Sequence, residues 1–199
     1  MLRLAVATQQ ETFERIREPL ADRGVEVVPV QASERTLSLS EPDLPSVDVG
    51  LVFPSRLMEG GAVSAALDVP WVNDREAILT SRNKAGVLAA LSAADVPVPE
   101  TTLVSNPVDD DAVADAAGAL QARTGSDSLV IKPNSTTRGV GVARVGDPDS
   151  LLGVTDYLDL VHDFRATGDR SYLLQEYLPD ARDYRAMIVD GEYAGAVER

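Results

Sequence analysis

The first seventy residues alternate between short apolar runs and segments with helical periodicity. Between residues 10 and 23, Phe13, Ile16 and Leu20 recur at the spacing of one helix face, and the pattern ends at Gly24. The expected strands of this part are residues 2–8, 25–30, 47–53 and 70–73, and the expected helices are residues 10–23 and 58–67. Strands that alternate with helices indicate a small parallel α/β unit.

A long helix is predicted next, over residues 75–94, with Ser81 as its candidate cap. Its apolar stripe, which we expect to be buried, consists of Val87, Leu88, Leu91 and Ala94. Pro97 and Pro99 follow, and proline cannot continue a helix.

The remaining residues predict an α+β arrangement with antiparallel hairpins. The expected strands are residues 101–104, 129–131, 140–145, 172–177, 184–189 and 192–197, and the expected helices begin at Asp109 and Leu151. The turn Asp190-Gly191 separates the last two strands, as in a hairpin. The change of pattern near Asn73 predicts two domains, residues 1–73 and residues 74–199.

The composition is that of a folded, acidic protein. Its 199 residues are 44% hydrophobic and carry 32 acidic against 18 basic side chains, a net charge of -14. Because such a chain repels nucleic acid and anionic lipid, and no basic patch offsets the repulsion, we expect neither as a partner. No signal peptide or membrane-spanning run is recognisable, so the cytoplasm is the expected location. The absence of Cys and the single His exclude thiol nucleophiles and multi-histidine zinc sites.

Only two of the basic residues are lysines, Lys84 and Lys132. Few lysines among many carboxylates indicate a protein adapted to high salt, where surface charges are screened. In this background each lysine is a candidate functional group. The alternative is that a lysine was retained by chance on a solvated face.

Lys132 ends an apolar strand and precedes a polar loop that contains Gly139 and Gly141. A cation beside flexible backbone suits a polyphosphate, because the ammonium neutralises charge while N–H groups surround the oxygens. The loop matches neither a dinucleotide fingerprint nor a Walker A loop, since its glycines enter a strand and no Gly-Lys-Ser/Thr occurs. By itself the pattern fits an ordinary hairpin loop equally well.

A second candidate segment, residues 173–179, is an apolar strand with a polar end, and Asp183-Tyr184-Arg185 opens the next strand. Free backbone groups beside an aromatic side chain can receive a purine, and a nearby carboxylate can bind the ribose. The alternative is an amphipathic strand in a hairpin.

In their order along the chain, these segments resemble the ATP-grasp superfamily, in particular its RimK-type and glutathione-synthetase-like carboxylate-amine ligases. The resemblance is carried by Asn73 to Ile78, Asn83-Lys84, Pro97-Val98-Pro99, Val130 to Pro133, Gly139 to Val142, Gln175-Glu176-Tyr177, Asp183-Tyr184-Arg185 and Ala196 to Arg199. It implies a small parallel pre-ATP-grasp α/β domain in residues 1–73, followed by an incomplete ATP-grasp fold in residues 74–199.

The resemblance also implies a role for each matching residue. Lys84 and Lys132 would contact the α and β phosphates of ATP. The loop over the triphosphate would comprise Ser135, Thr136, Thr137, Arg138, Gly139 and Gly141. The adenine hinge, acting chiefly through its backbone, would comprise Gln175, Glu176, Tyr177 and Leu178, with Asp183 beside the ribose. The candidate catalytic residues are Arg185 and Arg199, which would stabilise the transferring phosphoryl group.

The implied reaction is phosphorylation of a carboxylate by ATP with Mg²⁺, followed by attack of an amine and loss of phosphate. Positioning and electrostatics dominate this chemistry, which suits a chain without Cys. The implied partners are ATP, a carboxylate and an amine, such as an amino acid joined to a peptide, a protein or a small metabolite. A homo-oligomer is compatible with the family, and the sequence assigns no interface.

Two features depart from the family pattern. Thr136 stands where relatives commonly have Gly, and a β-branched side chain opposes a positive φ, so altered loop closure is expected. Family members also continue beyond a segment like Val197-Glu198-Arg199 into strands that carry the magnesium ligands. We therefore assign no metal ligand and expect the chain as it stands to be inactive. The alternatives are a non-catalytic nucleotide-binding or scaffolding protein of this fold and, third, an ATP-grasp kinase acting on a hydroxyl.

Overall fold

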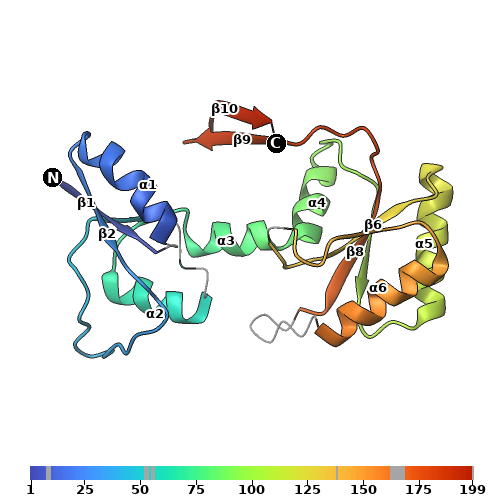
Figure 1. Cartoon of the computed structure of the whole chain (residues 1–199), viewed down its shortest axis with the longest axis horizontal. Helices are drawn as coiled ribbons and strands as arrows, with labels where there is room; N and C mark the ends of the chain where they lie inside the picture. Colours follow the sequence, from blue (N-terminus) through green and yellow to red (C-terminus); the bar gives the residue numbers. More distant parts are fainter. Residues whose placement is uncertain (8–9, 52–53, 55–56, 138, 162–168, 199) are drawn as a thin grey trace. The chain divides into compact units, whose positions relative to one another are not determined.

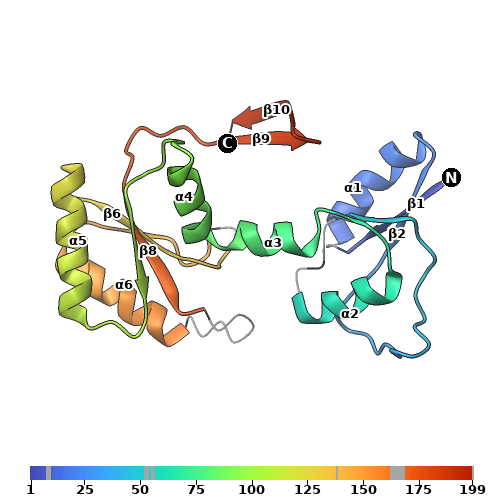
Figure 2. The ribbon, with the colours of Figure 1, turned by 180° about the vertical axis from the view of Figure 1, so that it is seen from behind.

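The computed structural model describes the chain except for residues 8–9, 52–53, 55–56, 138, 162–168 and 199. Contacts divide the described residues into two compact units (Figures 1 and 2). The first is drawn from Met1–Val98, Asn134–Arg138 and Asp163–Arg170, and the second from Pro99–Pro133, Gly139–His162 and Ser171–Arg199. The division into domains at Asn73 stays a prediction, and each unit is described by itself below.

The first unit contains a four-stranded sheet in the order β2-β1-β3-β4, and all its pairings are parallel. Its strands are β1 (Leu2–Val6), β2 (Val25–Pro29), β3 (Val49–Leu51) and β4 (Trp71–Val72), and its crossover helices are α1 (Gln10–Ala21) and α2 (Leu57–Leu67). The connections β1-α1-β2 and β3-α2-β4 run outward from the sheet centre in opposite directions. Because such connections between parallel strands are right-handed, α1 and α2 lie on opposite faces of the sheet, as Figure 1 shows. The predicted parallel α/β unit is confirmed.

A small core of Ala5, Val30 and Val63 holds this sheet together. Gly50 in β3 lies opposite Trp71 in β4, and a Cβ added at Gly50 would come within 2.4 Å of the Trp71 ring. Only glycine therefore leaves room for the indole at this position.

The predicted long helix is two helices, α3 (Arg75–Arg82) and α4 (Lys84–Ala93), separated at Asn83. Asn83 has φ -91° and ψ 81°, outside the helical region, and its side chain accepts a hydrogen bond from the Gly86 backbone N–H. A short amide side chain competes with the helix for these donors, which the apolar periodicity did not reveal.

Two details of the predicted helix are consequently wrong. Ser81 is no cap: its hydroxyl donates to the Ile78 carbonyl within α3. None of α4's residues is buried either, and Leu91 is 38% exposed. The apolar stripe is therefore only partly covered.

The second unit contains a four-stranded sheet in the order β5-β8-β6-β7, with every pairing antiparallel. Its elements are β5 (Thr101–Ser105), α5 (Asp110–Thr124), β6 (Leu129–Pro133), β7 (Ala143–Val145), α6 (Pro148–Val161) and β8 (Ser171–Glu176). Asp109 caps α5 by accepting from the Ala112 N–H, and Gly125 ends it in the left-handed region. The predicted antiparallel α+β arrangement is confirmed.

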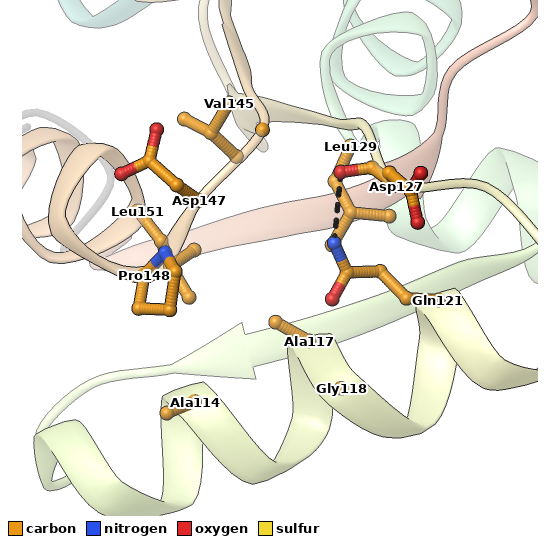
Figure 3. Close-up of a pocket in the computed structure, with 11 residues that line it drawn as sticks. Ala114, Ala117, Gly118, Gln121, Asp127, Leu129, Val145, Asp147, Pro148 and Leu151 are labelled. Atoms are coloured by element: carbon orange, nitrogen blue, oxygen red, sulfur yellow. Dashed lines mark hydrogen bonds between the residues drawn. The ribbon is translucent and has the colours of Figure 1, made fainter.

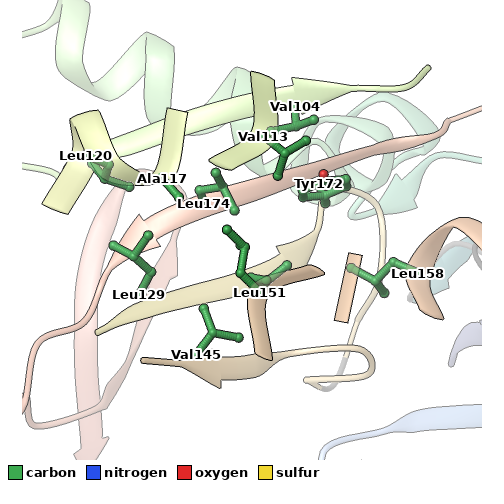
Figure 4. Close-up of a cluster of buried hydrophobic side chains, with 11 residues drawn as sticks. Val104, Val113, Ala117, Leu120, Leu129, Val145, Leu151, Leu158, Tyr172 and Leu174 are labelled. Carbon is green, nitrogen blue, oxygen red and sulfur yellow. The ribbon is translucent and has the colours of Figure 1, made fainter. Parts of the chain in front are cut away.

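Helices α5 and α6 cover one face of this sheet (Figure 1). The core between them and the sheet contains Leu120 of α5, Leu151 of α6, and Leu129, Ile131 and Leu174 of the strands (Figure 4). Because side chains alternate along a strand, burial of Leu129 and Ile131 turns Val130 and Lys132 to the opposite face. That face is the one free of α5 and α6.

The last two strands, β9 (Tyr184–Val189) and β10 (Glu192–Glu198), form a separate antiparallel hairpin. All six residues of β9 are exposed. Arg182, just before β9, binds Glu198 through two hydrogen bonds of 2.7 Å. Across the described part of the chain, no helix has the length and apolar character needed to cross a bilayer.

Candidate nucleotide site

Lys132 lies at one end of a short row of polar side chains, on the face of the antiparallel sheet that α5 and α6 do not cover. Its ammonium donates to Oε1 of Gln175 at 2.5 Å, and Nε2 of Gln175 donates to Oγ1 of Thr101 at 2.7 Å. These three residues come from the neighbouring strands β6, β8 and β5. Strand pairing thus fixes the ammonium in one position.

Burial gives this ammonium an unusual setting. Lys132 is only partly exposed, and desolvation lowers its pKa from the ordinary value. Within the described residues no carboxylate forms a salt bridge with it. Its hydrogen-bond partner is a neutral amide, so the positive charge is oriented without being neutralised. An anion that reached this face would find a positioned, poorly solvated cation.

Lys84, in the first unit, holds the segment that follows β6. Its ammonium donates to the backbone carbonyls of Asn134, at 2.8 Å, and Thr136, at 2.5 Å. Oδ1 of Asn134 accepts from the Ala85 N–H at 2.9 Å, and its Nδ2 donates to Oδ1 of Asn83 at 3.2 Å. The start of α4 and the predicted phosphate loop are therefore bound to each other. Lys84 therefore lies in contact with the start of this loop, and binding of one ligand by both stays a prediction.

The loop side chains differ in their environment. Thr136 is 7% exposed, and the Ser135 hydroxyl is buried with no hydrogen-bond partner among the described residues, whereas Thr137 is exposed. Leaving a buried hydroxyl without a hydrogen-bond partner costs free energy. The Ser135 hydroxyl therefore marks a place where a ligand oxygen could accept a hydrogen bond. Thr136 is not among the described non-glycine residues with a positive φ. The conformational conflict expected for a β-branched residue at this position is therefore absent, whereas altered closure of the loop over a triphosphate stays a prediction.

Gly139 and Gly141 both have φ near 74°, the left-handed region that favours glycine. At Gly141 a Cβ would also lie 2.7 Å from Cγ of Pro133. The turn into β7 therefore requires glycine at residue 141, both for its conformation and for the close approach to the end of β6.

The predicted adenine hinge begins where β8 ends. Glu176 is tied to Glu100: the Glu176 N–H donates to the Glu100 carbonyl at 2.9 Å, and the Glu100 N–H donates to Oε1 of Glu176 at 3.0 Å. Tyr177 is half-buried, and Leu178 is 48% exposed. Residues 177 and 178 thus leave a strand whose end is firmly anchored.

The remaining predicted site residues are only partly described. Asp183 lies in the exposed segment before β9, and Arg185 is an exposed residue of β9 opposite Val197. Arg138 and Arg199, together with the single histidine His162, lie outside the described residues. Of the candidate catalytic arginines, the structure therefore describes Arg185 alone.

A pocket of about 540 Å³ lies elsewhere in the second unit, beside α5 and the start of α6 (Figure 3). Its lining includes Leu129 and Val145, which belong to the core face of the sheet, so it does not open on the face that carries Lys132. Asp147 at its edge accepts hydrogen bonds from N and Oγ of Ser150, which hold the Asp147 pKa below its ordinary value. This carboxylate caps α6.

Sequence reasoning missed three residues that contact the predicted site. Thr101 binds Gln175, Asn134 binds Ala85 and Asn83, and Arg144 stacks on Tyr177. The contact of Thr101 with Gln175 depends on strand register, and that of Arg144 with Tyr177 depends on the position of the ring. Neither can be predicted from the local sequence pattern. Asn134 directly follows the Lys132-Pro133 pair, and its position at the start of the polar loop was the signal that could have identified it.

No family model matches the chain. Among curated proteins it resembles the tetrahydromethanopterin:alpha-L-glutamate ligase of Methanosarcina acetivorans, with 31% identity over 72% of this chain and 41% of that protein. It also resembles a probable alpha-L-glutamate ligase of Shewanella halifaxensis, with 26% identity over 93% of this chain and 41% of that protein. The chain thus spans less than half the length of these relatives.

Among solved structures, the chain resembles the RimK domain ATP-grasp protein of Sphaerobacter thermophilus. The TM-score is 0.70 with 25% sequence identity, and the match covers 99% of this chain and 72% of that one. The likeness includes both units, so it concerns the whole chain and not a local motif.

Proposed function

Because the chain has the ATP-grasp fold and is related in sequence to RimK-type carboxylate-amine ligases, we propose that it binds ATP for the activation of a carboxylate. The nucleotide would bind through Lys84, Lys132 and the loop of residues 135–141, with its adenine at residues 175–178. Glutamate is the proposed amine, by likeness to the relatives named alpha-L-glutamate ligases. The acceptor would carry a carboxylate on a peptide, a protein or a small metabolite.

The proposed reaction has two steps. A carboxylate oxygen of the acceptor attacks the γ-phosphorus of ATP, which breaks its bond to the bridging oxygen and gives an acyl phosphate and ADP. The amine nitrogen then attacks the acyl carbon, phosphate leaves with the electron pair of the C–O bond, and a proton is lost from nitrogen. Because charge accumulates on phosphoryl oxygens in both steps, the proposed contribution of Arg185 and Arg199 is electrostatic stabilisation.

The observation that carries the proposal is the setting of Lys132. Its ammonium is half-buried, is oriented by a buried amide and has no carboxylate partner among the described residues. Keeping a cation in this state costs free energy that an arriving phosphate would offset. A lysine retained by chance on a solvated face would not be expected to have a half-buried ammonium oriented by a buried amide.

Two further features support phosphate binding by the loop. Lys84 binds two loop carbonyls, so the loop is held beside a second cation. The Ser135 hydroxyl is buried and unpartnered within the described residues, which makes it a donor for a phosphate oxygen.

Mg²⁺ supplies charge neutralisation of the phosphates in this class of reaction. Within the described residues no group of three or more His, Cys, Asp or Glu side chains could hold a metal ion. We therefore assign no residue of this chain to the metal and derive no step from it.

ATP titration of the 199-residue chain in the presence of magnesium tests the proposal. Replacement of Lys132 by methionine removes the charge but keeps the length of the side chain, and should weaken ATP binding about 10- to 100-fold, the usual effect of losing a charge-assisted hydrogen bond. Arg15→Met is the matched control, because it removes one positive charge from an exposed position on α1. Equal affinity of wild type and Lys132→Met for ATP would refute the site.

Release of ADP separates the ligase from its alternatives. A ligase releases ADP when both carboxylate and amine are present, and a kinase of the same fold releases ADP with a hydroxyl acceptor and no amine. A protein that binds ATP and releases no ADP with any acceptor is the non-catalytic form.

Four expectations from the sequence remain proposals. They are the domain division after Asn73, adaptation to high salt, a cytoplasmic location without nucleic acid or membrane as partner, and a homo-oligomeric assembly.

A further inference from the structure

Arg144 lies over the aromatic ring of Tyr177. The Cζ atom of its guanidinium is 4.0 Å from the ring centroid, well within the range of a cation–π contact. Arg144 belongs to β7, and Tyr177 is the first residue after β8. The contact therefore joins an edge strand of the sheet to the start of the proposed adenine hinge.

A second contact also holds the guanidinium of Arg144. Nη2 of Arg144 donates to the Ser128 hydroxyl at 3.0 Å. Ser128 is itself held by Ser126, whose hydroxyl donates to the Ser128 carbonyl at 2.9 Å and accepts from its N–H at 3.3 Å. The arginine therefore connects a structured turn before β6 with a ring on the hinge, and its planar group can serve both contacts at once.

Strand register places Arg144 on the same face as the polar row. Val130 of β6 pairs with Arg144 on one side and with Gln175 on the other. Paired residues of antiparallel strands share a face, so Arg144 and Gln175 flank Val130 on the face that carries Lys132. Arg144 thus shares a face of the sheet with Lys132 and Gln175 of the proposed nucleotide site.

The described carboxylates leave the guanidinium of Arg144 without a salt bridge. The chain holds a comparable pair in which Arg182 lies 5.3 Å from the centroid of the Tyr184 ring, but Arg182 is also bound to Glu198 by two hydrogen bonds. In the described part of the chain, no carboxylate pairs with Arg144, and its hydrogen-bond partner is a neutral hydroxyl. The ring of Tyr177 consequently faces a cation that no described carboxylate engages, at an exposed position where such a contact contributes about 0.5 to 1 kcal/mol.

We propose that Arg144 is a positioning residue for the adenine. By stacking on Tyr177 it fixes the backbone conformation of residues 177 and 178, whose N–H and C=O groups would form hydrogen bonds with the base. The inference rests on the proposed function, since it assumes that this hinge receives a nucleotide. It goes beyond that function because it proposes that Arg144, a residue outside the hinge, contributes to the affinity for adenine. Arg144 would do so through its contact with the Tyr177 ring.

The test measures two ligands with the full 199-residue chain, ATP and inorganic tripolyphosphate, both with magnesium. Arg144→Met should weaken ATP binding about two- to fivefold and leave tripolyphosphate binding unchanged, because the lost contact orients only the base-binding segment. Arg144→Lys keeps a cation over the ring and should lose less. Arg15→Met controls for the change of net charge, and thermal unfolding verifies that each variant is folded.

A double-mutant cycle locates the effect at the ring. Tyr177→Leu removes the ring and should weaken ATP binding. In the Tyr177→Leu background, Arg144→Met should cause no additional loss.

The outcomes separate the inference from the proposed function. If the wild type binds ATP and Arg144→Met binds it equally well, the positioning role is refuted while the nucleotide site stands. Equal losses for ATP and tripolyphosphate would show that Arg144 acts on phosphates, which also refutes the positioning role. If the wild type binds neither ligand, the proposed function fails and the inference fails with it.

Discussion

Lys132 and Gln175 are diagonal neighbours on antiparallel strands, and the ammonium of the first donates to Oε1 of the second at 2.5 Å. Gln175 is only 7% exposed, and its Nε2 donates a hydrogen bond to Oγ1 of Thr101. Orientation by an amide leaves the charge of Lys132 available, whereas a carboxylate in the same position would have neutralised it. The relation makes Lys132 the most informative residue for testing.

The first prediction concerns the pH dependence of stability. The folded-state pKa of Lys132 is lowered below 10.5, so between this lowered pKa and 10.5 the unfolded chain binds more protons than the folded chain. The free energy of unfolding therefore rises with pH in that window. Below the window, the full cost of burying the charged ammonium lowers the stability of the folded chain. The free energy of unfolding of wild type minus that of Lys132→Met should increase from neutral pH toward pH 10.5 in urea titrations.

A matched comparison verifies the source of this trend. Arginine stays protonated throughout the range, so the difference between wild type and Arg15→Met should not change with pH. A flat or falling difference for Lys132→Met would show that burial does not lower the Lys132 pKa.

The second prediction concerns Asn134, which accepts a hydrogen bond from the Ala85 N–H at the start of α4. Asn134→Ala leaves that donor without its partner and should lower the free energy of unfolding by about 1 kcal/mol, as for loss of a helix cap. Asn134→Asp keeps the acceptor and adds a negative charge at a helix start, so its stability should stay close to that of wild type. Urea unfolding measures both, and equal losses in the two variants would contradict the capping role.

Leu174 is the subject of the third prediction, because it is fully buried in the core beneath α5 and α6 (Figure 4). Leu174→Ala should cost about 2 to 5 kcal/mol through the lost burial and the cavity left behind. Leu103 on β5 is 51% exposed, so Leu103→Ala should cost clearly less. Chemical denaturation of the two variants compares them, and similar losses would show that the core is misplaced.

The fourth prediction follows from the net charge of -14. Repulsion among carboxylates weakens as salt shortens the Debye length, from about 10 Å at 0.1 M to about 3 Å at 1 M. The midpoint of thermal unfolding should therefore rise as KCl is increased over this range.

A charge-reduced variant is the control for that salt effect. Glu18→Gln, Asp115→Asn and Asp156→Asn together remove three exposed carboxylates and should flatten the dependence on KCl. A midpoint that is independent of salt in the wild type would contradict adaptation to high salt.

Local pattern predicted the elements well where one periodicity was dominant. The parallel strands of the first unit and the antiparallel strands of the second follow from apolar runs separated by turn residues. The break at Asn83 was missed because it depends on a side-chain hydrogen bond to Gly86, which does not alter hydrophobic periodicity. The exposure of Leu91 was missed because periodicity identifies an apolar stripe but not whether another element covers it.

The sequence by itself determined the order of strands and helices, the acidic character and the two lysines that stand out in a chain nearly free of lysine. Each is a property of neighbouring residues or of composition. Tertiary structure alone decided that Gln175 orients Lys132 and that Arg144 lies over Tyr177. The physical reason is that these partners are more than thirty positions apart along the chain, and only the register of paired strands brings their side chains within contact distance.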